Sequence, residues 1–290
     1  MWGGRGLNVD PRLRIADLAP GDRRIAAADW SDLSVHAVSG PEDPDFAAAF
    51  DRLWAEFGAR GEMERRDVIA ARLRWMPARP AAGAALLYEL LVLRRCGTIV
   101  ALRDHTAIVR LDGRGRPRPE PTVVHLSHAL VEPAFRGSGL AAWLRALPLE
   151  CARRCAAQAG RTGDARVILV AEMEHPDPGD RDRMGRLRSY GRAGFLTLDP
   201  AALEYRQPDF RAAAALAGAV PAPLPLALVV RRVGAETENA MSAMDVAAVV
   251  ESIYAVYAVH VSAAALDPLR ADIAARVARQ PSFRLLPPAT

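Results

Sequence analysis

The 290-residue sequence predicts a mixed α/β (α+β) domain built around one central sheet. Strand-like apolar runs alternate with segments of helical periodicity, which is typical of this fold class. Hydrophobic residues make up 51% of the chain, enough for a sizeable core. No apolar run reaches the roughly 18–20 residues of a membrane helix, and the N-terminus lacks the apolar region of a signal peptide. We therefore expect a soluble, cytoplasmic protein.

The first third of the chain predicts an arm, a strand and two helices. Residues 1–32 are rich in Arg, Asp and Pro with little periodicity, so we expect an N-terminal arm or a poorly ordered lead-in. Alternation over 33–38 predicts a short strand. Asp43 or Asp45 then caps a helix with apolar residues at helical spacing, and a second helix is predicted over 63–75.

The middle of the chain predicts a run of antiparallel strands followed by helices and strands in alternation. Turn-like pieces separate the first four runs, which are rich in Val, Leu and Ile. These four predicted strands are 86–93, 99–102, 107–111 and 122–131. A helix to about residue 157, a strand over 167–174 and a helix ending near 191–194 follow. The last two predicted strands are 195–198 and 224–230.

Residues 234–290 predict a helical C-terminal extension beyond the sheet. Apolar residues recur at threes and fours from Met241, and a second helix is predicted over 267–279. Such amphipathic helices usually dock on their own domain or on a partner subunit, for example in a homodimer, and do not form a site.

Charge and cysteine content exclude several classes of protein. The net charge is +4, and the positive charge is carried by arginines spread along the chain, with no lysine. Because these arginines are not interleaved with aromatic residues, nucleic-acid binding is not indicated. With no long apolar run, we expect no membrane partner either. Three cysteines do not predict a disulfide framework, and Cys151 and Cys155 lack the further ligands of a zinc site. We expect no metal.

A stretch between a predicted strand and a predicted helix, Arg136-Gly137-Ser138-Gly139, leaves the backbone bare. Glycine lets a ligand approach the main chain closely. The first turn of a helix also has unpaired N–H groups that attract anions. Either the glycines only make a tight turn, or the amides of residues 135–141 surround a phosphate group.

A second motif lies one strand later and favours the phosphate interpretation. The segment Tyr190-Gly191-Arg192-Ala193-Gly194-Phe195 ends a predicted helix, with Gly194 as its natural stop. Together with Val131-x-Pro-x-x-Arg136-Gly-x-Gly139-Leu-Ala and the order of elements, this segment resembles the GNAT superfamily of acyl-CoA-dependent N-acyltransferases. The resemblance covers about residues 33–233 and implies a mixed, mostly antiparallel sheet flanked by helices.

The resemblance also implies acetyl-CoA as co-substrate. In this family, main-chain amides of the arginine-glycine turn bind the pyrophosphate, and the end of the preceding strand runs beside the pantetheine arm. The cofactor-binding residues so implied are Ala129, Leu130, Val131, Arg136, Gly137, Ser138, Gly139, Leu140 and Ala141. Tyr190 is expected to protonate the departing thiolate, the alternative being a purely structural role. Arg183 stands where many members carry asparagine; it either meets the phosphates or is solvated.

Four residues on the two strands that splay apart in this family are candidates for the general base. They are His125, His128, Glu172 and Glu174. Strand alternation predicts that His125 and His128 point to opposite faces, which excludes a metal pair. Glu172 is favoured over Glu174, because a charged residue on an apolar strand face is costly unless it is paired or lines a cavity.

The sequence therefore predicts an N-acyltransferase, with acetyl as the expected acyl group, in which a primary amine attacks the thioester directly. A strand amide near Leu130 or Val131 is expected to hold the oxyanion. The acceptor is a small-molecule amine or a protein N-terminus, and acidic residues hint at a cationic amine; they are Asp177, Asp180, Asp182 and Glu172. The alternative is a module of the same fold that binds acyl-CoA without turnover.

Overall fold

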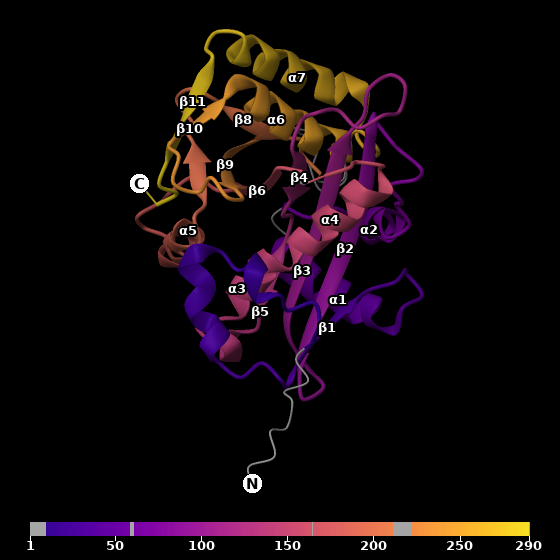
Figure 1. Ribbon diagram of the computed structural model, residues 1–290, viewed down its shortest axis with the longest axis vertical. Helices are drawn as coiled ribbons and strands as arrows, with labels where there is room; N and C mark the ends of the chain where they lie inside the picture. Colours follow the sequence, from indigo (N-terminus) through magenta and orange to yellow (C-terminus); the bar gives the residue numbers. More distant parts are fainter. Residues whose placement is uncertain (1–9, 59–60, 164, 211–221, 290) are drawn as a thin grey trace.

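The computed structural model describes residues 10–58, 61–163, 165–210 and 222–289, and its centre is a twisted sheet of eleven strands (Figure 1). All strand pairs are antiparallel except β4 and β6, which run parallel. The strands are β1 (Leu33–Ala37), β2 (Ala84–Arg95), β3 (Thr98–Arg110), β4 (Thr122–His125), β5 (Ala129–Val131), β6 (Val167–Met173), β7 (Leu196–Leu198), β8 (Tyr205–Gln207), β9 (Leu224–Arg232), β10 (Ala240–Ser242) and β11 (Ser282–Leu286). The predicted fold class is confirmed.

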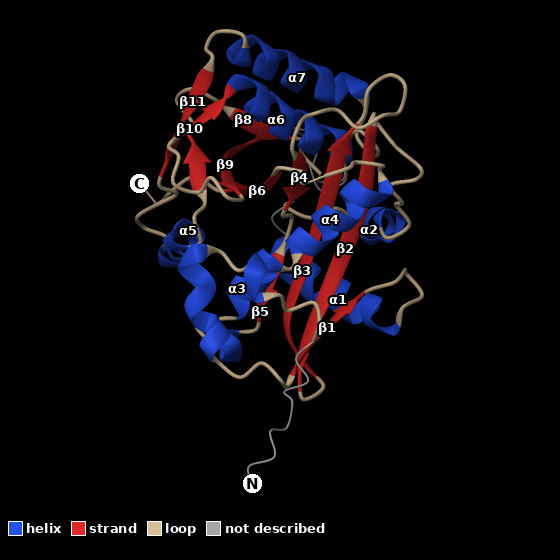
Figure 2. Ribbon diagram, in the orientation of Figure 1, coloured by secondary structure: helices blue, strands red, loops and turns tan. Residues whose placement is uncertain are grey.

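Helices cover both faces of the sheet (Figure 2). One face carries α1 (Pro44–Phe57), α2 (Arg66–Arg72), α6 (Ala243–Tyr257) and α7 (Ala263–Val277). The other face carries α3 (Leu140–Ala146), α4 (Pro148–Gln158) and α5 (Arg181–Arg192). Successive residues of the central strands alternate between the two cores, as Val123 and Val124 do on β4. A residue's place along a strand therefore fixes which helices it meets.

The described part of the N-terminal arm is ordered and packed, contrary to the expectation of a poorly ordered lead-in. Residues 10–32 contain two 3₁₀ segments, η1 (Ile15–Asp17) and η2 (Pro20–Ala27). Trp30 is buried edge-on against Trp143 of α3, with ring centroids 5.9 Å apart. The arm passes between α5 and α3 (Figure 1). Residues 1–9 of the predicted arm lie outside the described residues.

Two strand predictions are wrong in their boundaries. The runs 99–102 and 107–111 belong to one continuous strand, β3, which pairs with β2 along its whole length. Asp104, between the two runs, is buried and accepts hydrogen bonds from Tyr88 and His128. The run 122–131 is instead broken into β4 and β5, which both pair with β3. The break at residues 126–128 resets the alternation, so His125 and His128 lie on the same face of the sheet and not on opposite faces.

The C-terminal segment contributes more than helices. Both predicted helices are present as α6 and α7, but β11 also pairs with β7 and so joins the sheet. The buried apolar side chains of α6 pack against apolar residues of β4, β6 and β9. The division of the chain into arm, domain and extension stays a prediction. Among the described residues no helix combines the length and apolar character needed to cross a bilayer.

Candidate active site

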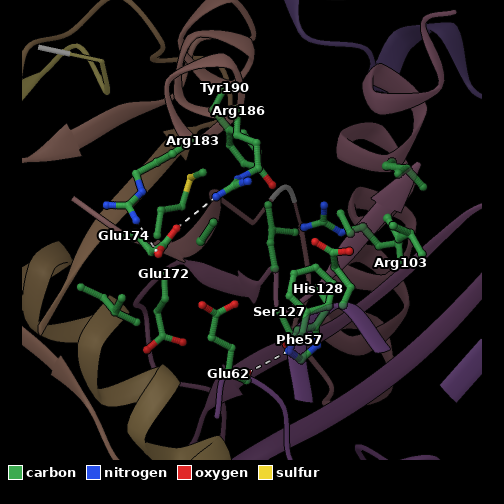
Figure 3. Close-up of a pocket in the computed structure, with 18 of the residues that line it drawn as sticks. Phe57, Glu62, Arg103, Ser127, His128, Glu172, Glu174, Arg183, Arg186 and Tyr190 are labelled. Atoms are coloured by element: carbon green, nitrogen blue, oxygen red, sulfur yellow. Dashed lines mark hydrogen bonds and ion pairs between the residues drawn. The ribbon is translucent and has the colours of Figure 1, made fainter. Parts of the chain in front are cut away.

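A cavity of about 680 Å³ opens where two neighbouring strands part (Figure 3). β4 and β6 are paired through His125 and Val170, after which β5 continues beside β3 alone. The cavity therefore passes between β5 and the end of β6, and residues from both faces of the sheet line it. Tyr190, Arg183 and Arg186 border one end, and Phe57, Glu62 and His128 border the other (Figure 3).

The arginine-glycine turn lies beside the first end of this cavity and presents unpaired amides. Gly137 and Gly139 adopt φ of 80° and 96°, a left-handed conformation that favours glycine. Among the described residues, the N–H groups of Gly137, Gly139, Leu140 and Ala141 have no backbone or side-chain acceptor. A Cβ atom at Gly137 would meet nothing within 4 Å, so this part of the turn is open to a ligand. The turn is suited to bind an anion.

The free edge of β5 faces the gap. His128 O accepts from Asp104 N at 3.1 Å, and Glu132 N donates to Val100 O at 3.0 Å. In an antiparallel ladder every second residue bonds to its neighbour strand. Leu130 lies midway between His128 and Glu132, so its N–H and C=O groups also face β3. The amides of Ala129 and Val131 point the other way, toward β6. Of the two amides predicted near the oxyanion, the geometry favours that of Val131.

Tyr190 lies on α5 and borders the cavity, with its ring held from two sides. Phe195 packs against it edge-on at 4.8 Å between centroids, and the Arg145 guanidinium lies 5.7 Å from its centroid. Arg145 is itself fixed by Asp22 of the arm, at 2.9 Å, and by Ser189. The phenol therefore has a defined direction beside the cavity.

Five arginines line the cavity: Arg103, Arg136, Arg145, Arg183 and Arg186. Arg183 and Arg186 hold the two oxygens of Glu174, at 2.8 and 3.1 Å. Glu174 is thereby occupied as an ion-pair partner, which makes it a poor candidate for the base. Arg183 is not merely solvated; it borders the cavity at the same end as the turn.

Glu172 and His125 form a hydrogen-bonded pair deep in the cavity wall. His125 Nε2 lies 2.7 Å from Glu172 Oε2, and the Tyr205 and Tyr257 hydroxyls also donate to this carboxylate. Burial alone raises the pKa of Glu172, but these hydrogen bonds outweigh burial and hold it below its usual value. Since the ionised carboxylate only accepts, His125 Nε2 carries a proton, and in a ring that holds this one proton Nδ1 presents a lone pair. Nδ1 has no partner among the described residues.

His128 is also in the cavity wall, but both its nitrogens are occupied. Nδ1 lies 2.9 Å from buried Asp104, and Nε2 lies 3.0 Å from the carbonyl oxygen of Glu62. Burial disfavours the charged ring, yet Asp104 overcomes burial and raises the pKa of His128 to about 9. A charged imidazole with two acceptors is a poor base at neutral pH. His128 is better placed as a structural cation.

The structure brings most of the predicted site residues together. The four candidates for acid and base, Tyr190, Glu172, His125 and His128, all line the cavity, as do Ala129, Leu130, Val131, Arg136 and Ala141. Gly137, Ser138, Gly139 and Leu140 form the adjoining turn, where the Leu140 side chain packs in the core.

The sequence did not reveal three further residues of the site. Tyr257 of α6 reaches Glu172, so the expectation that the C-terminal helices form no site is wrong. Tyr205 lies on a short strand that was not predicted. Arg103 was expected to lie in a turn between two strands, although a charged residue inside an apolar run is itself a signal of a functional site.

No protein-family model matches the chain, and no curated protein matches its sequence. Solved structures do match, and several are GNAT acyltransferases.

A tandem GNAT protein from the clavulanic acid biosynthesis pathway is 21% identical over 60% of this chain, with a TM-score of 0.37. The chain spans 46% of that protein's length. A GNAT family acetyltransferase from Elizabethkingia anophelis with acetyl-CoA bound is 14% identical, at 69% and 98% coverage and a TM-score of 0.33. FeeM, an N-acyl amino acid synthase from uncultured soil microbes, is 11% identical, at 70% and 92% coverage and a TM-score of 0.37.

Proposed function

We propose that this protein is an acyl-CoA-dependent N-acyltransferase that moves a short acyl group from a CoA thioester to a primary amine. The observation that carries the proposal is a single cavity bordered by three groups: the outward amides of β5, the Tyr190 hydroxyl and the Glu172–His125 pair. The likenesses to solved structures are distant, and the proposal rests on the chain's own residues.

The turn and the arginines suit the CoA half of the donor. Unpaired amides at the start of α3 and nearby guanidinium groups are the donors that phosphates prefer. The free edge of β5 offers alternating N–H and C=O groups to the amides of a pantetheine arm, as an added strand would. The thioester then lies at the gap, beside Ala129 and Val131.

The steps follow from the positions of the proposed acid and base. His125 Nδ1 takes a proton from the acceptor ammonium, while Glu172 holds the imidazole and stabilises its charge. The amine nitrogen attacks the thioester carbon, a C–N bond forms, and the oxyanion accepts a hydrogen bond from the Val131 amide. When the C–S bond breaks, Tyr190 gives its proton to the thiolate, and the second proton that the attacking nitrogen releases restores the Tyr190 phenol. Amide and free CoA result.

The far end of the cavity favours a cationic acceptor. Glu56, Glu62 and Glu64 line this end, and Glu64 forms a buried ion pair with Arg72. Carboxylates along this end of the cavity attract an ammonium group before its deprotonation at His125. Small amines and protein N-termini both satisfy this requirement.

The test is release of free thiol from a panel of short acyl-CoA donors with a panel of primary amines. We expect amine-dependent release by the wild type. Tyr190→Phe and Glu172→Gln should each lower kcat by about 100-fold or more and leave acyl-CoA binding within about 2-fold. Tyr254→Phe is the matched control, because this buried tyrosine donates to the Arg206 carbonyl and not to Glu172. Acyl-CoA binding with no turnover for any amine would indicate the non-catalytic module instead.

A further inference from the structure

Arg103 differs from the other arginines of the cavity. It is 1% exposed, and its Nε and Nη2 atoms have no hydrogen-bond partner among the described residues. The other four arginines bond to the Val131 carbonyl, to Asp22 or to Glu174. A buried guanidinium stays protonated, and leaving it without a partner is costly. Its place in a cavity wall suggests that a ligand supplies the missing anion.

The register of β3 places Arg103 at the acyl position. Arg103 is directly opposite Ala129, the β5 residue beside the gap. Along β3 it shares a face with Ala101, which packs in the core under α3, so it lies on the face of the turn and Tyr190. Its neighbour Asp104 faces the other way, toward His128. Arg103 therefore lies on the sheet face to which the CoA donor is assigned, beside the start of β5.

The wall around this point is apolar. Leu126, Leu144 and Ala171 line the cavity and pack in the cores on the same face of the sheet as Arg103. Figure 3 shows Arg103 and Glu172 on opposite sides of the cavity. His128, which borders the carboxylate-lined end, lies on the opposite face of the sheet from Arg103. The CoA phosphates are assigned to the turn, which lies at the other end of β5.

We infer that Arg103 binds a carboxylate at the distal end of the acyl group, so that the preferred donor is a dicarboxylic acyl-CoA of the malonyl or succinyl class. This inference rests on the proposed function. The planar guanidinium offers paired N–H donors to a carboxylate, and the apolar wall accommodates the methylene groups between carboxylate and thioester. The distal carboxylate takes no part in the bond changes. The C–N bond forms, the C–S bond breaks, and the product is an amide that keeps a free carboxylate.

The test is equilibrium binding of acyl-CoAs to the full-length chain, which requires no knowledge of the acceptor. The probes are CoA, malonyl-CoA, succinyl-CoA and their uncharged isosteres, isovaleryl-CoA and 4-methylpentanoyl-CoA. We expect the wild type to bind one dicarboxylic donor about 10- to 100-fold more tightly than its isostere, the range of a buried charged hydrogen bond. Arg103→Met should abolish this preference and leave the affinity for CoA within about 2-fold.

Arg186→Met is the matched control, since Arg186 lines the same cavity but lies at the end beside Tyr190. It should weaken CoA and all acyl-CoAs by one common factor. The Tm of ligand-free Arg103→Met should equal or exceed that of the wild type, because an unpartnered charge is removed.

Two results would overturn the inference while leaving acyl-CoA binding intact. One is equal affinity of the wild type for each charged donor and its isostere, a comparison that needs no variant. The other is a lower Tm of Arg103→Met with its donor preference unchanged, which would make Arg103 structural. Failure of every CoA ligand to bind would instead refute the proposed function itself.

Discussion

Alkaline pH is expected to destabilise this protein through one buried residue, His128. Its ring is sandwiched between Asp104 and the Glu62 carbonyl and packs against Phe57, at 5.0 Å between centroids. Tyr88 donates to the other oxygen of Asp104. These contacts stabilise the charged imidazole in the folded state and not in the unfolded chain.

The size of the effect follows from the pKa. The pKa of His128 is raised from 6.5 to about 9 by Asp104, against the opposing effect of burial. A group with a raised pKa stabilises the fold fully below its unfolded value, and this stability disappears as the pH rises through the folded value. A rise of about 2.5 units corresponds to about 3 kcal/mol. Since the chain has no lysine, few other groups change charge between pH 7 and pH 9.

Urea unfolding followed by circular dichroism between pH 6 and pH 10 measures this contribution. We expect the free energy of unfolding of the wild type to fall by about 3 kcal/mol over this range. His128→Gln should be less stable than the wild type at pH 6 and nearly independent of pH up to 9. Asp104→Asn should lose the same pH dependence, because burial then disfavours the charged ring. An undiminished fall in His128→Gln would refute the assignment of a charged His128.

Two further substitutions test the turn and the carboxylate network. Gly139→Ala should lower the free energy of unfolding by more than the roughly 1–2 kcal/mol expected for an alanine at positive φ, because its Cβ would meet an arm side chain at 3.1 Å. Gly137→Ala, whose Cβ would lie in open space, should lose only the free energy that the positive φ costs. Urea unfolding measures both variants. Tyr257→Phe should cost about 1.5–3 kcal/mol at pH 7 by removing a donor to ionised Glu172. The same loss at a pH where the carboxyl is protonated would show that the charge of Glu172 is not involved; Tyr254→Phe, which leaves that carboxylate untouched, is the control.

Local patterns predicted most of the regular elements, and they singled out the glycine turn and Tyr190, which the structure places beside one cavity. Alternation and helical spacing are local properties, and the two glycine motifs carry their backbone requirements within a few residues. The turn is one example. Gly137 and Gly139 both adopt the left-handed conformation that this turn requires in order to leave its amides unpaired.

What the sequence did not predict depends on contacts between distant segments. The sequence around Arg103 and Asp104 predicts a turn between two strands. These two charged residues lie instead inside a buried strand, because His128 pairs with Asp104 and the cavity lies beside Arg103. Tyr257 lies 85 residues from Glu172 along the chain, so no local pattern connects them. The choice of His125 over His128 as the proposed base likewise required the hydrogen bonds that distinguish the two rings.

Binding of CoA at the turn tests the central claim most directly. Gly137→Glu places a carboxylate where the pyrophosphate is proposed to lie, and Gly137→Ala carries the same backbone strain without the charge. Calorimetry at constant salt should show CoA binding to Gly137→Ala within a few-fold of the wild type, and a loss on the order of 100-fold in Gly137→Glu. Equal affinity of the two variants, or no binding of CoA to the wild type, would contradict the account.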